Sequence, residues 1–293
     1  MCRIWLLLVL IGATPAFAGC PPEGQSRESL QALKALKFTL PDPPARQTLA
    51  EGLVDCLGDP DPELRDGLAY EALTHWMRAK ELSPEGLRVL RDRLQAMLGE
   101  EDPAGFRRPF AALVLSEVAR TDRVEPWMEP GERAEMVDAA ARYLESVRDY
   151  RGYDEEEGWR HGVAHGADWL MQLTLNPALE RAQFDRILAA IATQVVPEPA
   201  HAYVFGEPGR LARPVLYIAK RGVYSEAEWQ AWLSAMTPTR GDTKLTYKDA
   251  VWLARRHDLL AFLTSLYLEA DQSEDAQIRA LKPAIVAALK TIW

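Results

Sequence analysis

Apolar residues recur three and four positions apart along almost the whole chain from residue 27 onward, and Pro, Gly and Asp interrupt the pattern at short intervals. This spacing places apolar side chains on one face of a helix, whereas strands show strict alternation. The pattern predicts helices over 27–37, 46–57, 63–81, 84–99, 105–120, 131–149, 157–175, 180–195, 208–220, 226–236, 247–270 and 275–292. Residues 202–205 alternate weakly, as a strand would. The expected fold class is therefore all-α.

One segment indicates how the helices pair. Residues 57–73, LGDPDPELRDGLAYEAL, resemble the joint of a HEAT repeat, in which a helix ends at an Asp/Pro turn and the next begins with an apolar residue and Arg, here Leu64 and Arg65. Small residues at core spacing then let paired helices stack closely. We expect residues 19–293 to form a single all-helical, HEAT-like domain, a helical-hairpin solenoid. A closed α/α toroid is the alternative, because about a dozen helices could form either arrangement.

The N-terminal residues predict export. Arg3, the apolar run 4–11 and the sequence Ala16-Phe17-Ala18 have the form of a secretory signal peptide, so we expect residues 1–18 to be removed. The apolar run is shorter than the roughly 20 residues that span a bilayer, and no later segment is long and apolar enough. The mature protein would be periplasmic or secreted, with no transmembrane segment.

The charge balance bears on the partner. The chain has 34 Lys and Arg against 43 Asp and Glu, a formal net charge of −9, and loss of Arg3 would make it more negative. An acidic protein repels phosphate backbones, and no Lys/Arg-rich run is present. We therefore expect no nucleic-acid partner.

Cys20 has two interpretations. Phe17-Ala18-Gly19-Cys20 resembles a bacterial lipobox, which would place a lipid anchor on Cys20, although an aliphatic residue is usual where Phe17 stands. Cleavage after Ala18 would instead leave two cysteines, Cys20 and Cys56, in the mature chain. An even number of cysteines in an oxidising compartment favours a disulfide. That bond would fasten the N-terminal tail to the second helix.

A polar stripe marks the helix predicted over 157–175. At about 100° per residue, five polar side chains share one narrow face: Glu157, His161, His165, Asp168 and Gln172. The opposite face carries Trp159, Val163, Ala164, Ala167, Leu170 and Met171 and would face a core. Gly162 and Gly166 lie between the two faces and would let another helix or a ligand approach the backbone, at a cost of about 1 kcal/mol each against alanine.

Three interpretations of this stripe remain open. It would be solvated if the helix is merely amphipathic, which suits a purely structural repeat scaffold. It would hold a divalent metal if His161, His165 and Asp168 act as ligands, because histidines four apart can turn toward one ion. The zincin motif is absent, since Gly162 follows His161 where that motif has Glu. It would be a pocket if the histidines and Asp168 bind or protonate a small ligand.

Other side chains are weaker candidates. Arg210 and Arg213 lie on one face of a predicted helix and would pair with an anion, an acidic partner or acids within the fold. Trp159 joins the ligand-binding candidates at the pocket, together with Glu157 and Gln172. Trp229 and Trp232 would form an exposed surface for a protein partner.

The central stretch also carries a family resemblance. Arg151-Gly152, Gly158-Trp159, His161 and Ala164-His165-Gly166-Ala167-Asp168 resemble the signature of a bacterial family catalogued as domain of unknown function 2785. The segment 210–213, RLAR, is similar to a later family segment, and 106–115 is similar to a family helix in which Pro109 and Ala111 replace two serines. The resemblance implies a helical, HEAT-like protein and no particular activity, and it favours the histidine stripe as a site.

The sequence thus predicts an exported protein that binds a small ligand or a protein partner through a pocket of His161, His165 and Asp168. A hydrolase-like enzyme that uses the same residues, with or without a metal, is the first alternative. A structural repeat scaffold is the second.

Overall fold

The computed structural model describes residues 19–237, 242–245 and 247–292; the predicted signal peptide, 1–18, lies outside them. Helices account for most of this part of the chain, so the all-α prediction is confirmed. They are α1 (Arg27–Ala35), α2 (Pro43–Leu53), α3 (Glu71–Arg78), α4 (Pro84–Met97), α5 (Arg107–Val124), α6 (Pro130–Ser146), α7 (Gly162–Thr174), α8 (Arg181–Val195), α9 (Glu207–Lys220), α10 (Glu226–Ala235), α11 (Ala250–Gln272), α12 (Ala276–Arg279) and α13 (Lys282–Lys290). The π-helical segment η2 (Glu63–Tyr70) leads into α3, and short 3₁₀ turns η1 (Asp55–Gly58) and η4 (Thr243–Leu245) precede η2 and α11.

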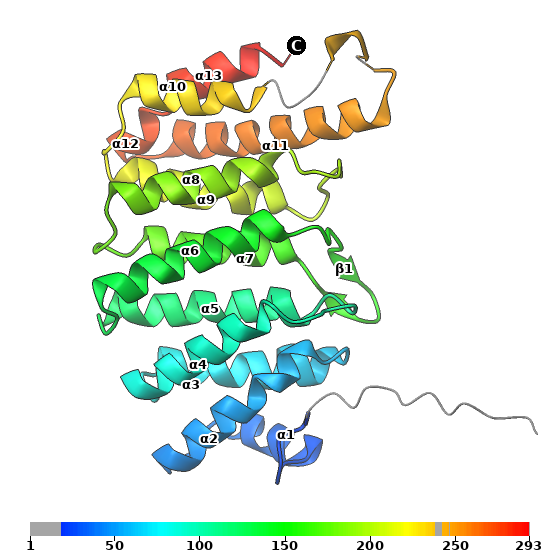
Figure 1. The fold of residues 1–293 in the computed structure, drawn as a ribbon, viewed down its shortest axis with the longest axis vertical. Coiled ribbons are helices and arrows are strands. Elements are labelled where there is room, and N and C mark those ends of the chain that lie inside the picture. Colours follow the sequence, from blue (N-terminus) through cyan, green and yellow to red (C-terminus); the bar gives the residue numbers. More distant parts are fainter. Residues whose placement is uncertain (1–18, 238–241, 246, 293) are drawn as a thin grey trace, which may run out of the picture.

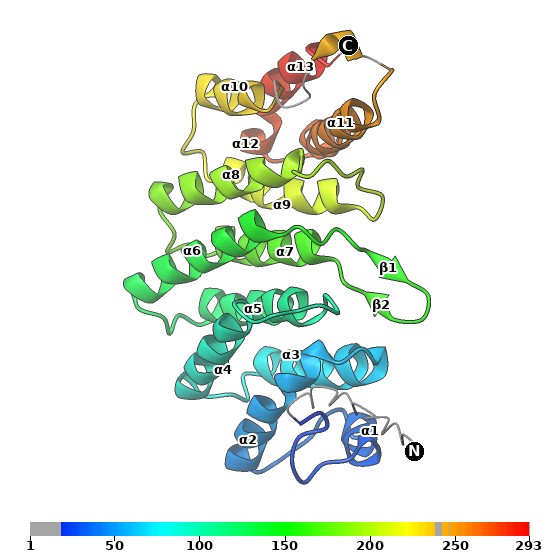
Figure 2. The same cartoon turned by 45° about the vertical axis from the view of Figure 1, so that its right-hand side comes forward.

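The helices stack in chain order in two layers (Figures 1 and 2). One layer contains α3, α5, α7, α9 and α11, each in contact with the next. In the other layer α2 packs on α4, α6 packs on α8, and α10 packs on α13. The layers meet where α4 contacts α5, α6 contacts α7, and α8 contacts α9. One cluster of buried apolar side chains extends between them from Leu30 to Ile292.

The apolar face of α7 lies in this core. Val163, Ala164, Ala167 and Leu170 are buried, as the helical spacing predicts. Gly162 and Gly166 face α6: a Cβ at Gly166 would lie 3.0 Å from the Tyr143 ring. The two glycines therefore let a helix, and not a ligand, approach the backbone of α7.

The predicted helix over 157–175 begins too early. Residues 153–159 form a small antiparallel hairpin of β1 (Tyr153–Asp154) and β2 (Gly158–Trp159), with Tyr153 opposite Trp159. The Asp154 side chain accepts the backbone N–H groups of Glu156 and Glu157 and so closes a turn. Gly158 and His161 adopt positive φ angles of 78° and 56°, which end the hairpin and delay the helix until Gly162.

Other predicted boundaries also shift. The weak strand at 202–205 is not formed; those residues are irregular and lead into α9. The helix predicted over 275–292 divides into α12 and α13, which begins at Lys282 and Pro283. Proline suits the first turn of a helix because its missing N–H is not needed there.

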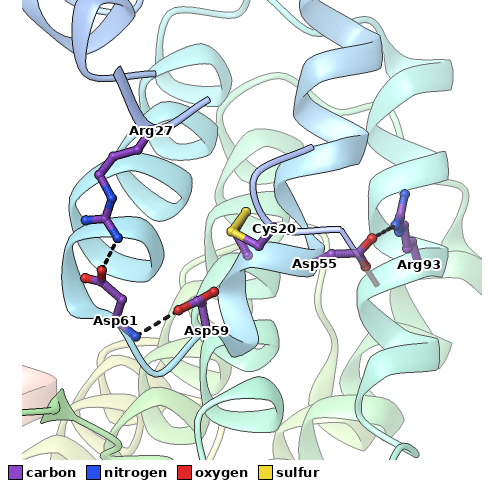
Figure 3. Close-up of a disulfide and its surroundings, with 7 residues drawn as sticks. Cys20, Arg27, Asp55, Asp59, Asp61 and Arg93 are labelled. Atoms are coloured by element: carbon purple, nitrogen blue, oxygen red, sulfur yellow. Dashed lines mark hydrogen bonds and ion pairs between the residues drawn. A yellow bond between two sulfur atoms is a disulfide. The ribbon is translucent and has the colours of Figure 1, made fainter. Parts of the chain in front are cut away.

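The N-terminal tail is tied to the first helices. Cys20 and Cys56 form the predicted disulfide, with Cα atoms 5.0 Å apart (Figure 3). Beside it the Arg27 guanidinium pairs with Asp61, whose backbone N–H donates to the Asp59 carboxylate. The Cys20 sulfur is therefore engaged by Cys56 and is not free to carry a lipid in this state.

Among the described residues, no helix combines the length and the apolar character needed to cross a bilayer.

Candidate functional site

A cavity of about 640 Å³ opens on the layer that contains α5, α7, α9 and α11. The hairpin covers one side of it through Trp159, and η2 contributes Tyr70 on another. Five of the predicted site residues line it: Trp159, His161, His165, Arg210 and Arg213. Its volume falls in the range of about 300–1,000 Å³ that small-molecule sites occupy.

His161 stands at the start of α7 in a left-handed backbone conformation, which is costly for a residue with a side chain. Its ring stacks on Trp159, with centroids 4.6 Å apart and planes 20° apart. The side chain is buried, yet its Nε2 has no hydrogen-bond partner, because Glu207 Oε1 is 3.7 Å away. Burial, aided by the charge of Arg210, lowers the pKa of His161 to about 4.

His165 lies one turn along α7 and is oriented by α5. Its Nδ1 is 3.1 Å from the carbonyl oxygen of Pro109, and its ring meets Phe110 edge-on at 5.4 Å. A carbonyl only accepts, so Nδ1 must hold the proton and Nε2 keeps a free lone pair. Burial first, then the neighbouring His161, lowers the pKa of His165 to about 3.

Asp168 binds an arginine that lines the cavity. Its Oδ2 accepts a hydrogen bond from Arg210 Nη1, whereas its Oδ1 is buried and has no partner. Burial raises the pKa of the carboxyl and Arg210 opposes that rise. Arg213 is exposed one turn further along α9, and within the described residues it makes no ion pair or hydrogen bond. The two arginines therefore differ, one being paired and one unpaired.

The three central residues are thus brought together, but they are not on a solvated face. His161, His165 and Asp168 are each less than a tenth exposed, so the interpretation of this stripe as a solvated helix face is wrong. They also do not fit a metal. Nowhere in the described part of the chain do three His, Cys, Asp or Glu side chains gather as a metal site would need, and the Asp168 carboxylate is already bound by Arg210.

The remaining candidates lie elsewhere. Glu157 is on the hairpin, where its carboxylate pairs with Arg160 at 2.7 Å. Gln172 is half-buried on α7 and does not line the cavity. Trp229 is buried and packs on Tyr224 and Trp232, so the expected exposed tryptophan surface is not formed.

Sequence reasoning missed the wall made by the segment before α9. Phe205 and Gly206 line the cavity, and Glu207 supports them by accepting the Phe205 N–H at 3.0 Å. The Phe205 ring occupies the space where a Cβ on Gly152 would lie, 2.0 Å away. The Gly206-Glu207-Pro208 sequence has the form of a helix start, and it is the feature of the sequence that could have indicated this wall. No local pattern reveals that Phe205 reaches Gly152.

Comparison with known proteins places the chain in a family. No curated protein and no solved structure is significantly similar to it. The family described as protein of unknown function (DUF2785) matches residues 94–268, which is more than half of the chain and includes the hairpin, α5, α7 and α9. The chain therefore belongs to the DUF2785 family of proteins of unknown function.

Proposed function

We propose that this protein binds a small molecule in the cavity between the hairpin, α5, α7, α9 and α11. The observation that favours binding is the buried imidazole of His161, a residue that lines the cavity and whose Nε2 has no hydrogen-bond partner. A buried polar atom without a partner costs about 1–3 kcal/mol. A bound ligand that supplies a hydrogen bond to it would recover that cost.

Binding is favoured over acid–base catalysis by the state of the histidines. A general base works best when its pKa lies near the ambient pH. The pKa of His161 is lowered to about 4 and that of His165 to about 3, so both rings are neutral and weakly basic at pH 7. Neutral imidazoles are suited to fixed hydrogen bonding with a ligand. A small molecule is also favoured over a protein partner, because Trp229 is buried.

We also propose the domain architecture and the compartment in which this protein binds its ligand. Residues 19–293 would form one HEAT-like solenoid domain, which the chain-order stacking of helices in two layers supports. The protein would act in the periplasm or be secreted after loss of residues 1–18. The Cys20–Cys56 disulfide supports an oxidising compartment.

A cavity-filling variant tests the binding proposal. Ser265 of α11 lines the cavity, whereas its neighbour Thr264 is exposed and does not. We would screen a small-fragment library by ligand-observed NMR against the wild type, Ser265→Phe and Thr264→Phe. The expected result is a set of fragments that bind the wild type and Thr264→Phe but not Ser265→Phe. The proposal fails if no fragment binds, or if the same fragments bind folded Ser265→Phe equally well.

A further inference from the structure

We propose that the natural ligand of this cavity is an organic anion, held through a carboxylate or phosphate group by Arg213, Arg210 and the first turn of α9. Its apolar part would lie against Trp159 and Phe205. The inference rests on the proposed function, because it concerns the same cavity, and it adds the chemical class of the ligand.

Arg213 is the first reason. It lines the cavity, it is exposed, and within the described residues no carboxylate lies within salt-bridge distance of it. Its charge reaches Asp168 only at longer range. Arg210, one turn away, uses one nitrogen for Asp168 and also lines the cavity. Two guanidinium groups on one helix face can bind a carboxylate or phosphate through charge-assisted hydrogen bonds.

The start of α9 is the second reason. Gly206 and Gly209 both line the cavity, so the backbone of this helix start is accessible there beside the Arg210 side chain. Pro208 has no N–H and the Glu207 carboxylate accepts its own N–H, so the Gly209 N–H is the backbone donor that this positive helix end offers to an anion. Buried His161 lines the same cavity, and its unpartnered Nε2 independently indicates a missing ligand atom.

Most acidic side chains at the cavity are paired with an arginine or held uncharged. Asp66 lines the cavity but lies 2.7 Å from buried Arg65, and Asp168 is paired with Arg210. Burial raises the pKa of Glu207, which favours its uncharged form. Glu269 of α11 is the remaining acid on the cavity wall, and it is exposed. The free charges on the wall are therefore Arg213 on α9 and Glu269 on α11.

The aromatic wall indicates that the anion has an apolar part. Trp159 and Phe205 line the cavity and remain 39% and 38% exposed, although their rings contact each other edge-on at 5.8 Å. Leu268 of α11 is 51% exposed on the same cavity. Inorganic phosphate would leave these apolar surfaces in water, whereas a ligand with a ring or an alkyl group would cover them.

The experiment compares two anionic probes with a neutral one, all of which carry a phenyl ring. We would titrate the wild-type mature chain with 3-phenylpropionate, phenyl phosphate and the neutral 3-phenylpropionamide, and follow binding by NMR. The variants are Arg213→Gln and Glu269→Gln, with Arg142→Gln as the matched control. Arg142 is an exposed arginine of α6 that lies away from this cavity. None of these exposed side chains contributes to the core, so the variants are expected to fold.

The expected result has three parts. At least one anion binds the wild type more tightly than the amide does, and Arg213→Gln weakens that binding on the order of tenfold, as loss of a charge-assisted hydrogen bond predicts. Arg142→Gln leaves the affinity unchanged, and Glu269→Gln leaves it unchanged or tighter because a like charge is removed. The carboxylate and the phosphate are distinguished by which probe binds more tightly.

The opposite results would overturn the inference. If the amide binds as tightly as the anions, or if Arg213→Gln has no effect, the ligand is not recognised by its charge. If Glu269→Gln abolishes binding and Arg213→Gln does not, Arg213 does not hold the ligand and the anion inference fails. If neutral fragments bind in the cavity and neither anion does, the proposed binding function survives while the anion inference fails.

Discussion

The Arg65 side chain donates a hydrogen bond of 2.7 Å to the carbonyl oxygen of Glu157, 92 positions further along the chain. The guanidinium is fully buried, also donates to the carbonyl of Asp59, and lies 4.0 Å above the Phe106 ring. Arg65, from the segment 57–73, thus fixes the hairpin, and through it Trp159, over the cavity. A single buried cation connects the Asp/Pro turn of that segment to the proposed binding site.

Replacing this arginine should loosen the hairpin. Arg65→Met keeps the length of the side chain but removes its carbonyl hydrogen bonds and leaves Asp66 without its partner, so we expect the free energy of unfolding to fall by about 3 kcal/mol. Hydrogen exchange at the amides of Gly158 and Trp159 should also accelerate. Arg27→Met, which breaks half-buried ion pairs with Asp61 and Glu63, is the control and should cost much less. Equal losses in the two variants would contradict the role assigned to Arg65.

The Phe205 ring should be the reason that a glycine is needed at position 152 of the Arg151-Gly152 motif. A Cβ at Gly152 would lie 2.0 Å from Phe205, so Gly152→Ala must displace the ring and should lower stability by about 1–3 kcal/mol. In a Phe205→Ala background the same substitution should be almost neutral. Chemical unfolding of the four chains of this double-mutant cycle measures the coupling. If Gly152→Ala costs the same in both backgrounds, the motif glycine serves another purpose.

The parts of this molecule that the sequence predicted are those set by local periodicity. The helices and the buried face of α7 follow from apolar spacing. His161 and His165 line one cavity, whereas Asp168 is connected to it through Arg210. The hairpin was missed because the Asp154 turn and two left-handed residues override a helical pattern of side chains. The cavity walls were missed for a different reason: contacts such as that between Phe205 and Gly152 depend on packing between distant segments.

Acid should destabilise the protein through His165. Its pKa is about 3 in the fold against about 6.5 in an unfolded chain, so folding favours the neutral ring. Its contribution is complete above pH 6.5 and is lost as the pH falls toward 3. At pH 5 this histidine alone should cost about 2 kcal/mol relative to pH 7 or above.

A non-titrating variant isolates that contribution. His165→Asn keeps an N–H that can donate to the Pro109 carbonyl but takes up no proton. Urea unfolding at pH 7 and pH 5 should therefore show a smaller acid loss in His165→Asn than in the wild type, by about 2 kcal/mol. Most other groups titrate alike in both chains and cancel in the comparison. The same acid loss in both chains would mean that His165 does not take up the proton on unfolding.

Gly209→Ala should make the protein more stable and weaken its binding of the ligand. A helical glycine costs about 1 kcal/mol against alanine, and a Cβ here would meet Ser265 Oγ at 3.8 Å, an ordinary contact. Gly209→Ala should therefore raise the melting temperature by about 2–4 °C. Because Gly209 and Ser265 both line the cavity, the added methyl group should narrow it and weaken ligand binding.

The matched control for Gly209→Ala is a substitution at Gly131 in the first turn of α6, where a Cβ would meet nothing within 4 Å. Gly131→Ala should stabilise the protein to a similar extent and leave binding unchanged, as measured by thermal unfolding and NMR titration of the same samples. A glycine at a helical position where alanine would fit lowers stability, and a ligand that occupies the open space would explain its presence. If Gly209→Ala is more stable and binds equally well, the first turn of α9 does not contact the ligand.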